Sequence, residues 1–301
     1  MGRLKGQNLR VFSGTTVIGA STNCVVTLTN NLQEVTTKDD VGGAQKQEVM
    51  STSWTVQVDS MAVQDIATLL TAMKAGTPFT LSFDKVATSN NQTPAGEGYA
   101  LQGSAYLTDL TVNFNDREYS VKSLTFTGTG ELTQGATISA TTITSPSKTR
   151  GEEVRLFIGV PSNPVVFEVI AAAKTLQLHV SVSTEVATTK DTTGMFDVIE
   201  PTGLAYDIST SALVSSGETI TSEVPGTDFL GAETYLLVDN MVKWKICNVQ
   251  GDNNRSAVSE PPIVQGYAIV QQLTVNAQNR QVATYTLNLT GNGDYTVGNA
   301  S

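Results

Sequence analysis

The residue types that most often carry acid–base, nucleophilic or metal chemistry are scarce in this sequence. His179 is the single histidine among 301 residues, and Cys24 and Cys247 are the two cysteines. A Ser-His-Asp arrangement would have to use His179, and no serine on a sharp strand-to-helix turn accompanies it. One imidazole and two distant thiols also provide too few ligands for a transition-metal site. We therefore expect no catalytic centre, no metal and no cofactor.

The neighbours of these three residues predict structural roles for them. Alternation along its strand puts His179 on the same face as Gln177 and Ser181, so we expect a polar-face strand residue. Cys24 and Cys247 each lie in a β-like run, which predicts a small buried hydrophobe. A disulfide between them would be unusual in a reducing compartment.

Paired carboxylates are the remaining candidates for catalysis. Asp39 and Asp40, like Glu152 and Glu153, fall in expected loops or linkers, whereas a catalytic pair needs a shaped cleft. We therefore predict solvated turn residues at these positions. The segment Thr127–Gly130 lacks the third glycine and the following helix that phosphate binding requires, so we expect the end of a strand there.

Composition favours a mainly β protein and excludes several classes of function. Charged residues are only 15% of the chain, and the formal net charge is −10. An acidic chain without a basic run does not fit a nucleic-acid-binding module, although it does fit a wall past which DNA slides. No stretch approaches the roughly 20 apolar residues of a membrane span. The first residues lack the apolar core of a signal peptide, so we expect folding in a cytoplasm.

An internal repeat is the most informative feature of the sequence. Gly103–Gly130 aligns with Gly266–Gly293 without a gap, at an offset of 163 residues. The two segments share Leu-Thr-Val-Asn, one arginine and a final Thr-Gly-x-Gly, so they combine strand, turn and charge residues in one order. This pattern indicates a duplication of a unit too long for a solenoid repeat.

Earlier segments repeat in the same order and place the boundary between the copies. Leu9–Gly14 corresponds to Val154–Gly159, and Glu34–Asp39 corresponds to Glu185–Asp191 with one extra residue. Between the copies, Gln134–Gly151 is rich in Thr, Ser and Gly, as linkers are. The predicted division is a first domain of residues 1–136, a linker of residues 137–149 and a second domain of residues 150–301.

Period-2 alternation inside the repeat predicts a long β-hairpin with one apolar and one polar face. Leu110, Val112 and Phe114 share one face, and turn residues follow at Asn115–Arg117 and again at Gln278–Arg280. The polar-face residues of both copies are Thr111, Asn113, Thr125, Thr127, Thr274, Asn276, Asn288 and Thr290.

One amphipathic helix is predicted in the first copy, over Met61–Ala75, where it would cover one face of a sheet. Gly76–Pro78 ends it. A counterpart is expected near Asp228–Val242, leading into a strand at Lys243–Val249, and Ser215–Gly226 resembles an inserted loop. The apolar stripe of the first helix consists of Val63, Ile66, Leu70 and Met73.

The first half resembles the major tail tube proteins of long-tailed, siphophage-type bacteriophages. The resemblance depends on the order of several motifs, which are Gly6–Phe12, Ile18–Cys24, Glu34–Asp39, the glycines Gly42 and Gly43, Ser53–Asp59, and Phe79–Phe83. The second half keeps Thr188–Asp191 and Gly194, but Leu204–Ile208 replaces the strand that carries tryptophan in the first half.

This resemblance implies a β-sandwich or barrel domain with a flanking helix. In that family, six such domains form a ring whose inner wall is a continuous β-barrel, and rings stack into a tube. A chain with two copies would then form a trimer that imitates a hexamer, with the polar faces listed above on the inner wall. The alternative is six chains per ring, with the second domain outside as decoration.

The same resemblance implies a structural protein of the virion tail, assembled in the host cytoplasm, and not an enzyme. Its partners would be further copies of itself and other tail proteins such as the tape measure, terminator and baseplate or tip proteins. Phage DNA would contact it only in transit through the lumen.

Two polar, glycine-bearing loops are predicted to contact a neighbouring subunit or ring, because they exceed ordinary hairpin turns in length. They are Lys38–Ser53 and Lys190–Gly203. The candidate contact residues are Lys38, Asp39, Asp40, Gly42, Gly43, Lys190, Asp191 and Gly194.

Two other classes of protein share parts of this pattern. A two-domain β-sandwich, such as a virion decoration protein or an adhesin, would have the same composition and repeat but would not form hollow rods. A carbohydrate-active enzyme or binding module would need aromatic platforms and a carboxylate cleft, whereas this chain has two tryptophans, one in each half.

Overall fold

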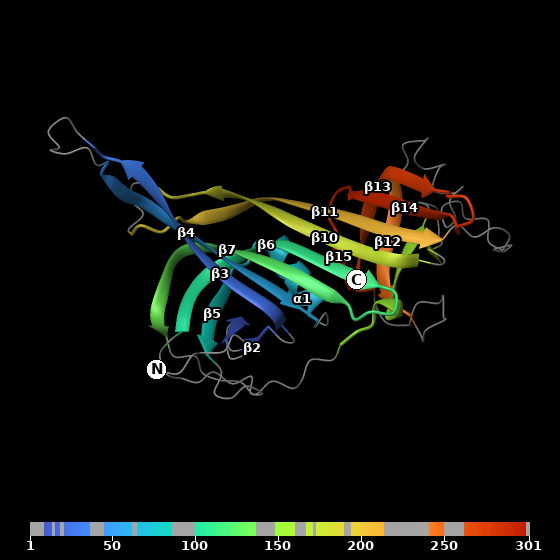
Figure 1. Ribbon diagram of the computed structural model, residues 1–301, viewed down its shortest axis with the longest axis horizontal. Coiled ribbons are helices and arrows are strands. Elements are labelled where there is room, and N and C mark those ends of the chain that lie inside the picture. Colours follow the sequence, from blue (N-terminus) through green and yellow to red (C-terminus); the bar gives the residue numbers. More distant parts are fainter. Residues whose placement is uncertain are drawn as a thin grey trace.

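The protein is described by a computed structural model, shown in Figure 1. The described residues are 9–13, 16–18, 21–36, 45–61, 65–85, 100–136, 148–159, 167–170, 173–189, 194–213, 241–249 and 262–298.

The predicted mainly β fold is confirmed. The first half contains strands β1 (Leu9–Ser13), β2 (Thr16–Val17), β3 (Ser21–Glu34), β4 (Gln47–Ser60), helix α1 (Ile66–Ala75), β5 (Phe79–Lys85), β6 (Ala100–Asn115) and β7 (Val121–Ala136). The second half contains a 3-10 turn (Gly151–Glu153), β8 (Val154–Gly159), β9 (Phe167–Val169), β10 (Ala173–Val186), β11 (Ile199–Leu213), β12 (Met241–Asn248), β13 (Val264–Asn276), β14 (Thr284–Gly291) and β15 (Thr296–Val297).

Eight long strands form one continuous antiparallel run through both halves, in the order β3-β4-β7-β6-β10-β11-β14-β13. Strand β6 joins the halves, because its edge opposite β7 pairs first with β5 and then with β10. Strand β13 likewise pairs with β12 along only part of its edge. In Figure 1, β3 and β4 continue past the body of the molecule as a two-stranded arm.

The hairpins β6–β7 and β13–β14 are equivalent, as the 163-residue offset predicts. Both turns use an arginine with positive φ, Arg117 at 60° and Arg280 at 64°. Non-glycine residues seldom adopt this conformation, so its recurrence at matching positions marks the same turn geometry.

A packed aromatic ring also recurs in the two halves. Trp54 lies so close to Gly128 that a Cβ there would be 2.0 Å from the indole. In the second half, Tyr206 lies in the same way against Gly291, where a Cβ would be 2.6 Å from the ring. The strand that lacks tryptophan therefore keeps the aromatic position, with tyrosine in its place.

Strand pairing defines which residues of the two halves are counterparts. Val56 pairs with Phe126 and Ile208 pairs with Leu289, so β3–β4 and β10–β11 match at an offset of 152 residues (208 against 56). This register corrects the alignment of Glu34 with Glu185, because Glu185 pairs with Glu200 as Gln33 pairs with Glu48. The predicted match of Leu9–Gly14 with Val154–Gly159 is confirmed over the paired residues, since β1 pairs with β5 as β8 pairs with β12.

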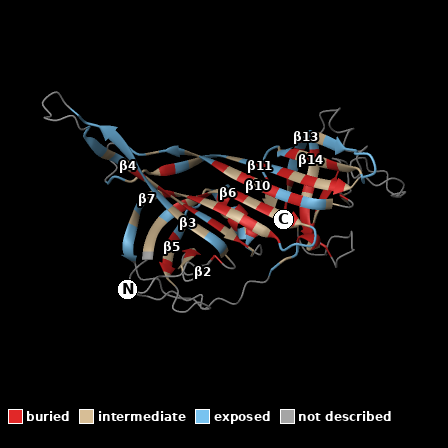
Figure 2. Cartoon of the chain, in the orientation of Figure 1, coloured by how far each residue is buried: buried red, intermediate tan, exposed pale blue. Residues whose placement is uncertain are grey.

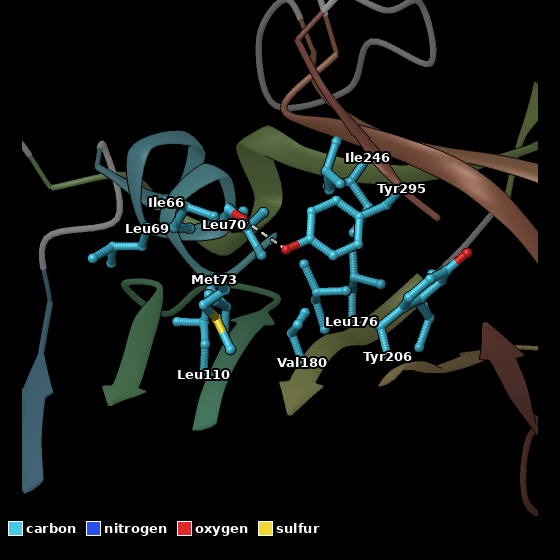
Figure 3. Close-up of a cluster of buried hydrophobic side chains, with 14 of the residues drawn as sticks. Ile66, Leu69, Leu70, Met73, Leu110, Leu176, Val180, Tyr206, Ile246 and Tyr295 are labelled. Atoms are coloured by element: carbon cyan, nitrogen blue, oxygen red, sulfur yellow. Dashed lines mark hydrogen bonds between the residues drawn. The ribbon is translucent and has the colours of Figure 1, made fainter. Parts of the chain in front are cut away.

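One hydrophobic cluster spans both halves. Helix α1 places Leu70 and Met73 against Leu110 of β6 and Val180 of β10, as Figure 3 shows. The hydroxyl of Tyr295 donates a hydrogen bond of 2.7 Å to the Leu70 carbonyl oxygen, so the end of the chain is tied to the first-half helix. The two halves therefore share one packed interior.

Several boundaries differ from the sequence predictions. Helix α1 begins at Ile66 instead of Met61, and it ends where predicted, with a left-handed C-cap at Gly76. Strand β12 begins at Met241, so the end of the helix predicted for Asp228–Val242 is wrong. The described residues do not include the rest of that helix, Val63, or the Ser215–Gly226 loop.

Two predictions about turns are also wrong. The segment Thr127–Gly130 lies within β7, which continues to Ala136, because Gly130 adopts a φ of 74° that kinks the strand without ending it. Glu152 is buried instead of solvated, and it accepts a hydrogen bond of 2.9 Å from Arg150. Figure 2 shows buried residues alternating with less buried ones along the long strands.

Candidate self-assembly edges

The junction between the halves is a strand pairing, and it shows how two copies of the repeat fit together. Strand β6 meets β10 in antiparallel register from Asn115↔Thr175 to Asp109↔Ser181. The apolar residues that this pairing brings together are fully or nearly buried, and they are Leu110, Val112, Phe114, Leu176, Leu178 and Val180.

A groove between β8 and β10 receives the end of β6. Phe114 enters it beside Val154 and Leu176, and only about 10 Å³ remains unfilled. The backbone N–H of Asp116 donates a hydrogen bond of 2.9 Å to the Lys174 carbonyl oxygen. At the next turn, Gly151 passes so close to β6 that a Cβ there would be 2.1 Å from the Asn115 carbonyl oxygen.

Polar side chains cross the same junction on the other face of the sheet. His179 Nε2 lies 2.8 Å from Asp109 Oδ2, and its Nδ1 lies 3.9 Å from Asp207 Oδ2. Gln177 donates a hydrogen bond of 2.9 Å to the Asn113 side-chain oxygen. His179 is therefore a polar-face strand residue as predicted, and its contacts tie β6, β10 and β11 together.

The His179 cluster, which consists of His179, Asp109 and Asp207, is a set of cross-strand contacts. It borders a hollow of about 240 Å³ whose lining includes Ser209 and Asn288. Ser209 Oγ donates to the Asn288 side-chain oxygen at 2.7 Å, so its hydroxyl is engaged with an amide and not with the imidazole. Within the described ranges, the His, Cys, Asp and Glu side chains form no group suited to a metal ion.

Strand β3 has an open edge where its counterpart β10 is covered. Among the described strands, β3 pairs only with β4. The groove beside it is lined by Leu9, Arg10, Phe83 and Ser21–Cys24, and it encloses about 390 Å³. Burial raises the pKa of the Cys24 thiol to about 12. Arg10 of β1 donates a hydrogen bond of 3.3 Å to the Ser21 carbonyl oxygen, so it links β1 to the start of β3.

Strand β13 has the matching open edge. Its residues Val264–Ile269 pair with β12, but among the described strands Leu273–Asn276 pair only with β14. Val275 is 39% exposed, whereas its counterpart Val112 is 0% exposed at the covered junction. Within the described residues, the chain thus has one closed junction between its halves and one open edge at each end of the eight-stranded run.

The residues predicted for an inner barrel lie on the polar face of this run. Their side chains are half-buried or exposed. The residues between them are buried on β6, β7 and β14, whereas on β13 Leu273 is half-buried and Val275 is exposed. Some hydrogen-bond to neighbouring strands: Thr127 to Thr108 at 2.9 Å, and Thr290 to Gln271 at 3.1 Å. The structure brings together Thr111, Asn113, Thr125, Thr127, Thr274, Asn276, Asn288 and Thr290 on this face.

The predicted contact loops are described only in part, and both were predicted too long, because Gln47–Ser53 belong to β4 and Ile199–Gly203 belong to β11. Gly194 is exposed with a φ of 105°. The segment after it lies on the first half, where Thr52 N–H donates to Met195 at 2.6 Å and Gly130 N–H donates to Asp197 at 2.9 Å. Outside the described residues lie Lys38, Asp39, Asp40, Gly42, Gly43, Lys190 and Asp191.

Sequence reasoning missed the His179 cluster, the two grooves and the open edges. The three residues of the cluster are 70 and 28 positions apart along the chain (Asp109 to His179, and His179 to Asp207), so only strand pairing reveals them. One signal was available for the edges. The apolar face of the repeat continues in Leu273 and Val275, at the positions that match Leu110 and Val112.

Among the described residues, no helix is long and apolar enough to cross a membrane. Neither a protein-family model nor a curated protein matches the chain.

Solved structures with some similarity are components of tails and tail-like particles. The tail of an empty gene transfer agent particle is 15% identical, with a TM-score of 0.36, over 48% of this chain and 96% of that chain. The SPP1 tail tube is 12% identical, with a TM-score of 0.34, over 50% of this chain and 80% of that chain. The baseplate of an anti-feeding prophage is 11% identical, with a TM-score of 0.32, over 52% of this chain and 98% of that chain. These TM-scores do not establish a common fold.

Proposed function

We propose that this chain is a structural subunit of a phage tail tube that polymerises as stacked rings. The observation that carries the proposal is the β6–β10 junction, at which one copy of the repeat docks on the other by strand pairing. The chain ends this run with open edges on β3 and β13, the counterparts of the two strands already joined. A subunit with complementary open edges closes into a ring when the rotation fits, and ring closure removes the edges.

Three chains per ring is the stoichiometry that we favour. The two domains, residues 1–136 and 150–301, would alternate around the ring and provide six tube units. Strand direction supports closure, because the eight strands alternate in direction and β13 therefore runs opposite to β3. An outside decoration would have no use for a second hairpin whose polar face continues that of the first.

The polar face of the run would line the lumen. It carries hydroxyl and amide side chains, with carboxylates at Asp109 and Asp207. Such a wall would bind DNA weakly, because it offers few cations to phosphates, and this suits a conduit for DNA delivery. The function is then structural instead of enzymatic, and the location is the virion tail, with assembly in the host cytoplasm.

Ring stacking would use the loops at the ends of the long arms. The contact of Met195–Asp197 with the first half supports this assignment, because it is already a contact between one loop and a neighbouring tube unit. Lys38–Ser53 would make the equivalent contact on the adjoining subunit. Other tail proteins, including the tape measure, terminator and baseplate or tip proteins, would meet the ends of the tube.

Electron microscopy of the purified protein tests this function. We expect hollow rods in negative stain, and three chains in each ring by cryo-electron microscopy. Six chains around one ring would refute the trimer. Discrete particles without a lumen would refute the tube and would favour a virion decoration protein or an adhesin.

A further inference from the structure

We infer that the open groove beside β3 receives the β13–β14 turn of a neighbouring copy, in a residue register that the internal β6–β10 junction defines. The inference rests on the proposed function, and it names the two surfaces and the pairing by which rings would close.

The open groove beside β3 and the groove beside β10 are lined by counterpart residues, and β6 fills the second one. Ser21–Cys24 are the counterparts of Ala173–Leu176, and Arg10 is the counterpart of Arg155. The arginines make matching hydrogen bonds, Arg10 to the Ser21 carbonyl at 3.3 Å and Arg155 to the Ala173 carbonyl at 3.4 Å. The first groove encloses about 390 Å³, whereas the second retains about 10 Å³ because β6 fills it.

The turn that fills the second groove has a counterpart between β13 and β14, and among the described strands none but β14 pairs with Leu273–Asn276 beside it. Phe114 and Asp116 correspond to Ala277 and Asn279 at the offset of 163 residues. Both turns share the left-handed arginine, Arg117 in one and Arg280 in the other. The β13–β14 turn therefore has the backbone shape that fits such a groove, although its own chain provides no groove for it among the described residues.

Counterpart positions give the register directly. The junction pairs Thr111 with His179, and their counterparts are Thr274 and Thr27. The complete predicted pairing is Gln272↔Thr29, Leu273↔Leu28, Thr274↔Thr27, Val275↔Val26, Asn276↔Val25, Ala277↔Cys24 and Gln278↔Asn23.

Burial supports a partner at these edges. Leu28 is 52% exposed, whereas its counterpart Val180 is 0% exposed beneath the closed junction. Val275 and Val112 differ in the same way. Apolar side chains in this pattern on unpaired strand edges are an aggregation hazard unless a neighbour covers them.

The occupant that fits is a second copy of this chain, because one copy presents both complementary surfaces. The strand direction is antiparallel, as at the closed junction. The sequence adds one further match: Gly151, which leaves room for the Asn115 backbone, aligns with Gly6, a residue outside the described ranges.

Disulfide trapping tests the register. Thr27 and Thr274 are exposed, so the double variant Thr27→Cys/Thr274→Cys should fold as the wild type does. Directly opposed residues in antiparallel strands have Cα atoms about 4.5–5.5 Å apart, within the range that a disulfide spans. We expect oxidation of the assembled protein to move most chains to three times the 31.9 kDa chain mass on a non-reducing gel.

Two further variants calibrate the result. Thr111→Cys/His179→Cys places the same pair of positions at the closed junction, where they are paired, and should give an intrachain disulfide. Thr29→Cys/Thr274→Cys keeps the sheet face but shifts the register by two residues, to a diagonal separation of about 7–8 Å. It should lose most of the cross-linked product.

A charge test uses two residues of β13 with nearly equal exposure. Val275 is 39% exposed on the open edge, and Ile269 is 37% exposed where β12 already pairs. Val275→Asp should abolish ring formation with the monomer still folded by circular dichroism, and Ile269→Asp should leave assembly intact.

The outcomes separate the two proposals. Rods with an intrachain disulfide in the Thr111/His179 variant, but no Thr27–Thr274 cross-link, would overturn the register and leave the tube function standing. Cross-linked trimers without rods would support the edge contact and refute the tube. Cross-links that extend to six chains would support the register and refute the trimer.

Discussion

The counterpart valines of the closed and open edges allow one sharp prediction. Val112 is 0% exposed at the β6–β10 junction, and Val275, at the matching position of β13, is 39% exposed. The residue type, the strand position and the substitution to alanine are the same in both. Among the described strands, Val112 has a neighbour on both sides and Val275 on one, so comparing the two variants reports chiefly on the contribution of the junction to the free energy of unfolding.

The expected magnitudes follow from the carbon atoms removed. Val112→Ala deletes two buried methyl groups, worth about 0.8 kcal/mol each by transfer, and leaves a cavity that adds roughly 24 cal/mol per Å³. A loss of about 2–3 kcal/mol is expected. Val275→Ala removes partly hydrated atoms, so the monomer should lose less than about 1 kcal/mol. The difference corresponds to about tenfold or more in the unfolding equilibrium.

Urea unfolding, followed by tryptophan fluorescence at a concentration where sedimentation shows a monomer, measures both losses. Trp54 and Trp244 are both buried, one in each half, so the fluorescence reports on the unfolding of both halves. Equal destabilisation by the two variants would refute the reasoning, because it would mean that β13 is covered in the monomer. Under assembly conditions the order should change, and Val275→Ala should raise the protein concentration needed for rod formation.

Three further predictions concern single residues. Lys122 is fully buried and pairs with the Asp65 carboxylate, and burial lowers the Lys122 pKa. Lys122→Met removes the buried charge, while the Asp65 side chain is 47% exposed and stays solvated, so the variant should match or exceed the wild-type stability at pH 7. Because the unfolded chain holds this proton up to higher pH, wild-type stability should rise relative to Lys122→Met as pH approaches 10.5; a constant difference in urea midpoints would contradict this. Gly128→Ala would put a Cβ 2.0 Å from Trp54 and should cost about 1–3 kcal/mol or more, whereas Gly203→Ala, with its nearest atom at 3.9 Å, should change the thermal midpoint little. Burial raises the pKa of Cys24 to about 12, so its alkylation by iodoacetamide at pH 8 should be roughly a thousandfold slower than in unfolded chain, and rates similar in both states by mass spectrometry would refute the burial.

The sequence predicted the hairpins well because their signal is local. Alternation identified Leu110, Val112 and Phe114 as the buried face, and turn residues located the turn of each hairpin. Helix α1 was placed five residues early, since the pattern from Met61 continues the apolar spacing without a clear N-cap.

The sequence could not reveal how the copies dock, because docking depends on strand register across the chain. The repeat alignment placed Glu185 one position from its true counterpart, since polar arm residues of similar type align almost equally well at either offset. In a strand, a shift of one residue exchanges the two faces, so an alignment error of that size would reverse every contact at the edge.

The two junctions differ in one respect that bears on assembly. The closed junction packs Phe114 against Leu176 and links His179 to Asp109, whereas the proposed junction between chains would oppose Ala277 to Cys24 and Thr27 to Thr274. It therefore buries less apolar surface and has no charged contact at the matching positions, and burial contributes about 25 cal/mol per Å². The closed junction lies within one chain, so the tight packing of Phe114 and Leu176 there would hold the two proposed tube units of that chain rigidly together before assembly. In the proposed ring, a weaker junction between chains would let wrongly placed subunits dissociate, and the ring would gain its stability from three such contacts closing at once. In this arrangement the duplication halves the number of weak junctions that a six-unit ring must form.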